Sequence, residues 1–201
     1  MGFFIGEKMT LRGKHIKSLL KAIPSNNCRY YLNGLYVNFD LKEIAVTNGH
    51  ILVLLENLEE LDLDGYGEVI IPRKVIEAAT SVCDLKAPVK ITNSDFSIGD
   101  LTIRYLPIEY KYPDFRKVFP KKEISYKDSR FCWFKSEFVK IVEKIAKDYV
   151  IDFKFFPPEN EEISPLKLTG VSSDCSASVT ILLCKMDVDI NGKNKFHGDD
   201  K

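Results

Sequence analysis

The side chains that could act as nucleophiles or metal ligands lie far apart in this sequence of 201 residues. Its five cysteines are odd in number and no pair has zinc-finger spacing, which favours reduced thiols in a cytoplasmic protein. They are Cys28, Cys83, Cys132, Cys175 and Cys184. The sequence also lacks a glycine-rich phosphate loop, a Gly-x-Ser-x-Gly motif and a His, Cys and Asp cluster at metal-binding spacing. We therefore expect a protein that is not an enzyme and that uses no metal or cofactor.

An acidic segment, residues 56–64, is the strongest candidate for a cation site. Its carboxylates are Glu56, Glu59, Glu60, Asp62 and Asp64. The segment lacks the ligand spacing and the central glycine of a calcium loop, so we expect it to be a solvated loop.

Lysines recur at helical spacing in two stretches, and an Arg-Lys pair begins a third helical stretch, a pattern that suits contacts with a phosphate backbone. These basic residues are Lys14, Lys17 and Lys21, then Arg73 and Lys74, then Lys140, Lys144 and Lys147. Phosphate contacts hold nucleic acid without reading its sequence. Because the formal net charge is zero, such binding must come from a local basic face. The alternative is that these lysines are simply the solvated faces of amphipathic helices.

Three predicted helices position these basic residues. The first spans residues 10–23, where apolar side chains recur at i, i+3, i+4 and i+7. The second covers residues 73–83 and follows Pro72, since proline is favourable at the start of a helix. The third runs from Ser136, a suitable N-cap, to about Lys147.

Strand-forming residues and turn dipeptides occupy most of the remaining sequence. Strands are expected near residues 29–38, 43–47, 50–55, 68–71, 88–92, 95–98, 101–106, 123–132, 149–156, 163–169 and 177–186. The segment 107–120 carries three prolines, so we expect it to link two blocks rather than form a central strand. Each block combines helix and strand, which predicts an α+β fold with repeated domains. No apolar run approaches the length of a membrane span.

Four motifs follow one another in the first block, at residues 29–34, 47–50, 71–74 and 112–118. They read Arg-Tyr-Tyr-Leu-Asn-Gly, Thr-Asn-Gly-His, Ile-Pro-Arg-Lys and Tyr-Pro-Asp-Phe-Arg-Lys-Val. In this order and spacing they resemble the middle domain of the bacterial sliding clamp, the β subunit of DNA polymerase III.

The resemblance covers roughly residues 9–187. After Pro120 it is to the second half of the family's last domain, so the chain is expected to be a shortened and divergent clamp. The implied divisions are a clamp domain at 1–120, a partial clamp domain at 121–190 and a polar tail at 191–201. The family's first domain and the first half of its third are expected to be missing.

Members of this family form closed rings of similar domains around duplex DNA, with helices lining the hole and sheets forming the outer wall. The resemblance therefore implies antiparallel sheets with helices on one side, and a DNA surface that does not select sequence. The residues implied for that surface are Lys14, Lys17, Lys21, Arg29, Tyr30, Tyr31, Arg73, Lys74, Lys140, Lys144 and Lys147.

The family also binds short peptides in a hydrophobic pocket between its middle and last domains. The matching positions are Leu32, Thr47, Gly49, His50, Ile51, Leu52, Pro113, Lys117, Val118, Leu182 and Cys184. Apolar walls with a few polar groups suit an extended peptide with large apolar anchors. This sequence departs from the family at Ile51, where an arginine is usual, and at Cys184-Lys185, where Met-Pro is usual. We expect His50 to be a turn residue with no chemical role.

Two functions remain open. The first is a cytoplasmic DNA sliding clamp, a processivity factor that encircles duplex DNA as a homo-oligomer and binds peptides of a DNA polymerase and a clamp loader. The second is a clamp-derived interaction module that keeps the peptide pocket without encircling DNA. The mass in solution separates them, because a chain of this length cannot surround a duplex alone.

Overall fold

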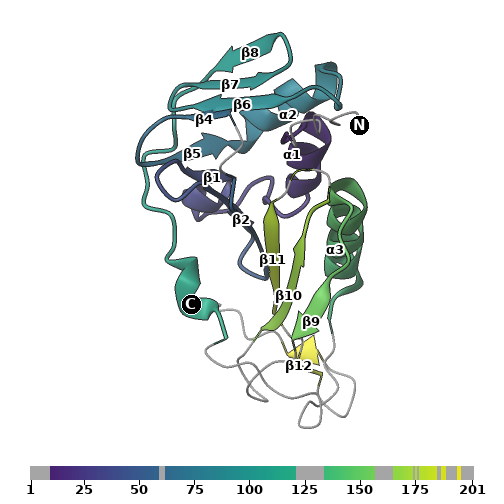
Figure 1. Ribbon diagram of the computed structural model, residues 1–201. Helices are drawn as coiled ribbons and strands as arrows, with labels where there is room; N and C mark the ends of the chain where they lie inside the picture. The colour runs from purple at the N-terminus through teal and green to yellow at the C-terminus, as the bar shows by residue number, and fades with distance from the viewer. Residues whose placement is uncertain are drawn as a thin grey trace, which may run out of the picture.

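The computed structural model describes most of the chain and has the predicted α+β architecture, with three helices on one side of antiparallel sheet (Figure 1). The described residues are 10–58, 62–120, 134–156, 165–173, 175, 177–184, 187–188 and 194–195. The strand predicted near 123–132 lies outside them. No helix in these ranges is both long enough and apolar enough to span a membrane.

A seven-stranded antiparallel sheet forms the centre of the fold. In spatial order its strands are β5 (Glu68–Pro72), β1 (Gly34–Asn38), β2 (Glu43–Thr47), β3 (Ile51–Glu56), β11 (Ser178–Leu183), β10 (Leu166–Val171) and β9 (Lys154–Phe156). The β3–β11 ladder runs from Glu56 opposite Ser178 to Ile51 opposite Leu183. The blocks on either side of Pro120 therefore share one sheet rather than forming separate ones.

The beginning of this sheet corrects the prediction for residues 29–38. Residues Tyr30–Leu32 form the 3-10 helix η1, and β1 begins only at Gly34. A Cβ atom at Gly34 would lie 2.6 Å from the backbone oxygen of Ile71 on the neighbouring strand β5. The close approach of β1 to β5 thus requires glycine at the point where the strand starts.

A second sheet of four strands packs beside the first, at the top of Figure 1. Its strands are β4 (Asp62–Asp64), β6 (Val89–Thr92), β7 (Asp95–Ile98) and β8 (Leu101–Arg104). Strand β4 runs parallel to β6, an exception to the antiparallel expectation. The end of the acidic segment 56–64 is therefore strand and not loop. A further pair, β12 (Asp187–Val188) and β13 (Asn194–Lys195), is antiparallel.

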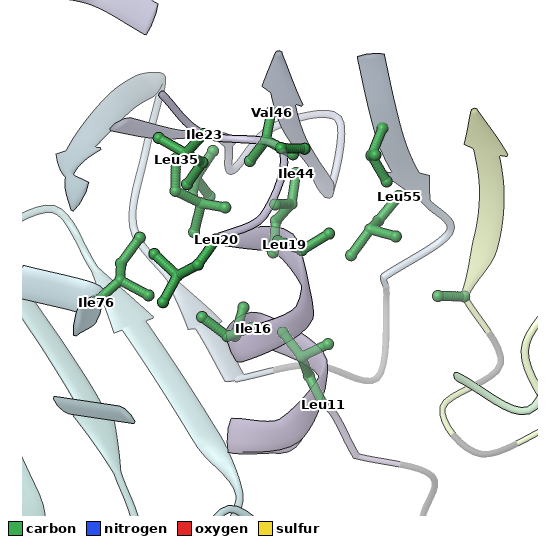
Figure 2. Packing of buried hydrophobic residues seen from close by; sticks show 14 of the residues in the cluster. Leu11, Ile16, Leu19, Leu20, Ile23, Leu35, Ile44, Val46, Leu55 and Ile76 are labelled. Atoms are coloured by element: carbon green, nitrogen blue, oxygen red, sulfur yellow. The ribbon is translucent and has the colours of Figure 1, made fainter. Parts of the chain in front are cut away.

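The three helices pack on the same face of the central sheet through one hydrophobic core. They are α1 (Gly13–Leu19), α2 (Arg73–Val82) and α3 (Ser136–Tyr149). Figure 2 shows Leu19 of α1 beside Ile44 of the sheet, and Ile76 of α2 beside Leu20, the residue that follows α1. Helix α1 is shorter than predicted, because its backbone continues beyond Leu19 as tight i to i+3 turns.

The opposite face of the central sheet carries a second apolar cluster. Seven buried residues form it, and we call them the outer cluster: Tyr36, Ala45, Leu52, Leu54, Ile70, Tyr112 and Leu182. Segment 105–119 crosses this face and ends in the 3-10 helix η2 (Phe115–Val118). The proline-rich segment thus covers the sheet on the side away from the helices.

Candidate DNA-facing helices and peptide-binding site

The helices α2, α1 and α3 form a continuous layer, because α1 contacts both of its neighbours. On one side the Lys17 ammonium donates to the backbone oxygen of Thr80 in α2, at 3.4 Å. On the other, the Tyr149 hydroxyl of α3 donates to the backbone oxygen of His15 at 3.2 Å, and the two rings lie 4.6 Å apart. Side chains that leave this layer away from the sheet share one surface, which we call the helix face.

Most of the predicted lysines are exposed on the three helices. The exposed ones are Lys17, Lys21, Lys74, Lys140, Lys144 and Lys147, whereas Lys14 is half-buried. Lys144 forms an ion pair with Asp148 one turn later, at 2.6 Å. Among the described residues, Lys21, Lys74, Lys140 and Lys147 form no ion pair. These four cationic groups are therefore available to an anionic ligand.

Arg73 has a structural task that the motif did not reveal. Its guanidinium donates to the backbone oxygens of Leu20, at 2.8 Å, and of Ile23, and it also pairs with Glu77 at 2.7 Å. These carbonyls follow α1, where a helix leaves acceptors without intrahelical donors. Arg73 therefore ties the end of α1 to the start of α2, and its charge is already used inside the protein.

Arg29, Tyr30 and Tyr31 lie in or beside η1, apart from the three helices. The Arg29 guanidinium packs against Gly49. The backbone φ of Gly49 is +92°, a conformation that would be strained for any residue with a side chain. The Tyr31 ring lies 6.5 Å from that of Tyr110 and packs on the outer cluster. These motif residues thus adjoin the elements predicted to bind peptide, and only Arg29 and Tyr30 are strongly exposed.

The turn between β2 and β3 gathers several of the predicted peptide-binding residues. The Thr47 hydroxyl donates to the backbone oxygen of Ile51 at 2.7 Å and accepts from the Gly49 amide at 3.0 Å. The His50 carbonyl accepts from the Cys184 amide at 2.8 Å, just after β11 ends. Leu52 and Leu182 are directly opposite each other in the ladder. Residues far apart in the sequence therefore meet at one end of the β3–β11 pair.

Ile51 does not belong to this surface. Successive side chains of a strand point to opposite faces, so Ile51 and Leu52 separate. Leu52 lies in the outer cluster, whereas Ile51 is 1% exposed in the core beneath the helices. The structure therefore places Ile51 away from the surface where it was predicted to contact a peptide.

The chain's own aromatic rings cover the apolar part of the predicted pocket. Leu52 and Leu182 are only 5% and 3% exposed, and the outer cluster to which they belong includes Tyr112. Tyr112 stacks on Tyr36 at 4.7 Å, and burial raises the pKa of Tyr36 to about 12. Phe115 packs edge-on against both tyrosines. The exposed part of the site is consequently its rim.

That rim is formed by η2 and the residues around it. Val118 is 54% exposed, and Lys117 is exposed beside its ion-pair partner Asp114 at 3.3 Å. Pro113 is half-buried, whereas Leu32 is fully buried at the end of η1. The rim combines an apolar side chain with a lysine, as a peptide-binding surface requires.

An ion-pair cluster that the motifs did not identify holds η2 on the sheet. Arg116 of η2 bonds to Glu43 of β2 and lies 3.9 Å from Glu56, the last residue of β3. Glu43 has only 8% of its side chain exposed. Burial, followed by the charge of Glu43, raises the pKa of Glu56. Arg116 therefore balances two neighbouring carboxylates, and we call these three residues the clasp.

No arrangement suited to catalysis accompanies these surfaces in the described residues. The His50 ring stacks on Phe138 at 6.1 Å, and burial with the nearby charges of Lys135 and Arg29 lowers its pKa. The described part of the chain contains no group of three potential metal-ligating side chains. Its four cysteines form no disulfide with one another, and Cys132 lies outside it.

Sequence comparison relates about half of the chain to bacterial beta sliding clamps. It is 33% identical to the beta sliding clamp of Caulobacter vibrioides over 114 residues, and 29% identical to that of Pseudomonas putida over 107. Each match covers 50% of this chain, and the two cover 30% and 29% of those relatives' own length. No protein-family model matches the chain.

Solved structures extend the similarity of fold to nearly the whole chain. The Helicobacter pylori beta clamp, in a complex with diflunisal, aligns with a TM-score of 0.59 at 12% identity, over 93% of this chain and 69% of that one. The DNA polymerase III subunit beta of Pseudomonas aeruginosa gives 0.59 at 14% identity, over 93% and 68%. A further Helicobacter pylori clamp, bound to a DNA ligase peptide, gives 0.56 at 13%, over 93% and 68%. The predicted resemblance and fold class are confirmed.

Proposed function

We propose, from the clamp fold and the partial sequence similarity to bacterial beta sliding clamps, that this chain is a subunit of a cytoplasmic DNA sliding clamp. Several copies would surround duplex DNA with their helix faces inward and serve as a processivity factor, without enzymatic activity. The observation that carries the proposal is the helix face itself. All three helices lie on one side of the sheet. Lys74, Lys140 and Lys147 on them, and Lys21 in the turns after α1, have no described ion-pair partner.

The physical argument concerns charge and geometry. A protein with no net charge gains affinity for DNA only where its cations are gathered on one surface. Lysines on a rigid helix layer contact phosphates without reading bases, so the protein stays free to slide. In this arrangement residues 1–120 act as one clamp domain, 121–190 as a partial one and 191–201 as a tail. Arg73 contributes to the fold and not to DNA.

The first test reverses charge on the helix face. The double variant Lys21→Glu and Lys74→Glu should weaken association with duplex DNA at low salt, and the difference should shrink at high salt as counterion release becomes less favourable. Fluorescence anisotropy with a labelled duplex measures the effect. The matched control, Lys90→Glu with Lys111→Glu, makes the same charge change at exposed sites outside the helices. Equal binding by both double variants at low salt would exclude the helix face.

The competing function is an interaction module that binds peptides without surrounding DNA. It is favoured by the gathering of predicted peptide-binding residues at one end of the β3–β11 pair, an arrangement that needs no ring. Sedimentation with and without duplex DNA separates the two proposals. A clamp assembles into an oligomer that associates with the duplex, whereas a module keeps the same mass whether DNA is present or not.

Both functions include a peptide site at the rim beside η2, for peptides of a DNA polymerase or clamp loader. Support comes from the Helicobacter pylori clamp bound to a DNA ligase peptide and from the grouping of Thr47, Gly49, His50 and Cys184 beside Leu52 and Leu182. Because Leu52 and Leu182 are covered, we propose that a ligand contacts Val118 and Lys117 first and reaches the leucines by displacing an aromatic ring.

A second test addresses this site by titration calorimetry. The probe is an extended peptide with a glutamine and three large apolar residues, and Val118→Asp should weaken its binding about tenfold, since one truncated anchor costs roughly 1–3 kcal/mol. The control is Val171→Asp, at a valine that is 66% exposed on β10. Equal affinity of Val118→Asp and Val171→Asp for the peptide would refute the assignment.

A further inference from the structure

A cavity of about 280 Å³ lies between the edge strand β5 and the segment that crosses the outer face of the sheet. Tyr110, which is 62% exposed, provides the open aromatic wall, whereas Tyr36 and Tyr112 line the floor and are 6% and 5% exposed. Glu68 and Glu109 add two exposed carboxylates. The amide of Ile108 donates to the backbone oxygen of Ile70 at 2.9 Å, which fixes the segment against β5. The cavity volume falls just below the roughly 300–1,000 Å³ typical of pockets that bind drug-sized ligands. It suits a single side chain.

The cavity lining carries negative charge from two glutamates, and no cationic side chain in the described lining neutralises it. The nine described residues that line it include no lysine, arginine or histidine. Glu68 accepts a hydrogen bond from the Asn38 amide at 3.3 Å, and neither Glu68 nor Glu109 forms an ion pair in the described part of the chain. A cation entering here would meet two carboxylates and the exposed ring of Tyr110.

We propose that this cavity binds an arginine side chain of a partner protein. The planar guanidinium stacks on tyrosine rings and donates to carboxylates in a fork, which lysine cannot do. Phosphate groups of nucleic acid are excluded because Glu68 and Glu109 would repel them. A purely apolar side chain gains nothing from the two carboxylates. Charge complementarity and the aromatic wall therefore select one occupant.

This arginine site lies apart from the helix face and from Val118 of the rim, and its lining shares Tyr36, Ile70 and Tyr112 with the outer cluster. It lies at the β5 edge of the sheet, whereas the peptide-binding positions gather at β3 and β11. The inference therefore does not depend on whether the chain forms a ring or encloses DNA. It predicts an additional contact for a protein partner that carries an arginine flanked by apolar residues.

The test uses two five-residue peptides with blocked ends, Gly-Leu-Arg-Leu-Gly and the same sequence with citrulline in place of arginine. Citrulline keeps the shape of the guanidinium and removes its charge. Titration of the full chain, followed through the ring signals of Tyr36, Tyr110 and Tyr112 by NMR, should show binding of the arginine peptide about tenfold tighter than that of the citrulline peptide.

Variants locate the effect on the protein. The double variant Glu68→Gln and Glu109→Gln keeps hydrogen-bonding capacity but should remove the preference for arginine. The control, Asp84→Asn with Asp100→Asn, neutralises two exposed carboxylates outside the cavity and should retain it. Thermal melting verifies that each variant is folded. Equal binding of both peptides, no binding at millimolar peptide, or full preference in the Glu68→Gln and Glu109→Gln protein would overturn the proposal.

Discussion

At the scale of the residue, neighbouring positions on one strand can have unrelated roles. Leu52 faces the outer cluster while Ile51 fills the core under the helices. Arg73 matched a motif associated with DNA, yet its guanidinium caps the end of α1. A motif fixes which residue type is present, but the side chain's partners depend on the direction in which the backbone points it.

The position of Ile51 gives a prediction about stability. Ile51→Arg should destabilise the protein by about 4 kcal/mol or more, because it places an unpaired charge in the closed core. Ile51→Val should cost only about 1 kcal/mol, since it removes one methylene group. Urea unfolding measures both free energies. If Ile51→Arg unfolds at the same urea concentration as Ile51→Val, the side chain is not in the core.

At the scale of the element, the clasp determines how η2 lies on the sheet. Glu43 and Glu56 are on adjacent strands, and Arg116 is the described cation that bonds to Glu43 and approaches Glu56. Lys117 and Val118 follow Arg116 directly, so the clasp also sets the orientation of the proposed rim. A short 3-10 helix has few hydrogen bonds of its own and depends on such contacts.

Breaking the clasp should release η2. Arg116→Ala leaves a largely buried carboxylate beside a second one, and we expect a loss of about 1–3 kcal/mol in the free energy of unfolding. Hydrogen exchange should accelerate over residues 105–119. Lys117→Ala, next to it, should have little effect, because an exposed ion pair contributes about 0–1 kcal/mol.

A second variant tests the cause. Adding Glu43→Gln to Arg116→Ala removes the repulsion between the carboxylates and should recover part of the lost stability. If the double variant is no more stable than Arg116→Ala alone, charge balance is not what holds η2 in place.

At the scale of the whole molecule, the two blocks depend on each other. Strand β11 adds to β3 through six residue pairs, and α3 contributes Phe138, Ile145 and Tyr149 to the same core as α1 and α2. The sheet would otherwise end at β3 with an unpaired and strongly apolar edge. Such an edge is a template for aggregation.

Truncation makes this interdependence measurable. A chain ending at Pro120 should aggregate or lack cooperative unfolding, whereas removal of residues 191–201 alone should leave the thermal midpoint nearly unchanged. Light scattering and circular dichroism distinguish the outcomes. A monomeric 1–120 chain with a cooperative transition would mean that the first block folds without β11 and α3.

The sequence alone determined the elements and the resemblance. Periodicity located the three helices, because an apolar stripe at i, i+3, i+4 and i+7 must be buried on one side whatever lies opposite. Turn dipeptides and strand formers likewise located β2, β3 and three strands of the smaller sheet, β6, β7 and β8, but not β4. The four clamp motifs gave the fold class, since they depend on local order and spacing.

Only the tertiary structure decided which partners these elements have. The pairing of β3 with β11 joins residues more than 120 positions apart, a contact that local preference does not encode. The same packing placed Ile51 in the core and enclosed the cavity beside β5. It also brought Arg73 to a backbone carbonyl after α1, and Arg116 to the carboxylates of Glu43 and Glu56. In each case the role of a side chain depends on what lies opposite it across the fold.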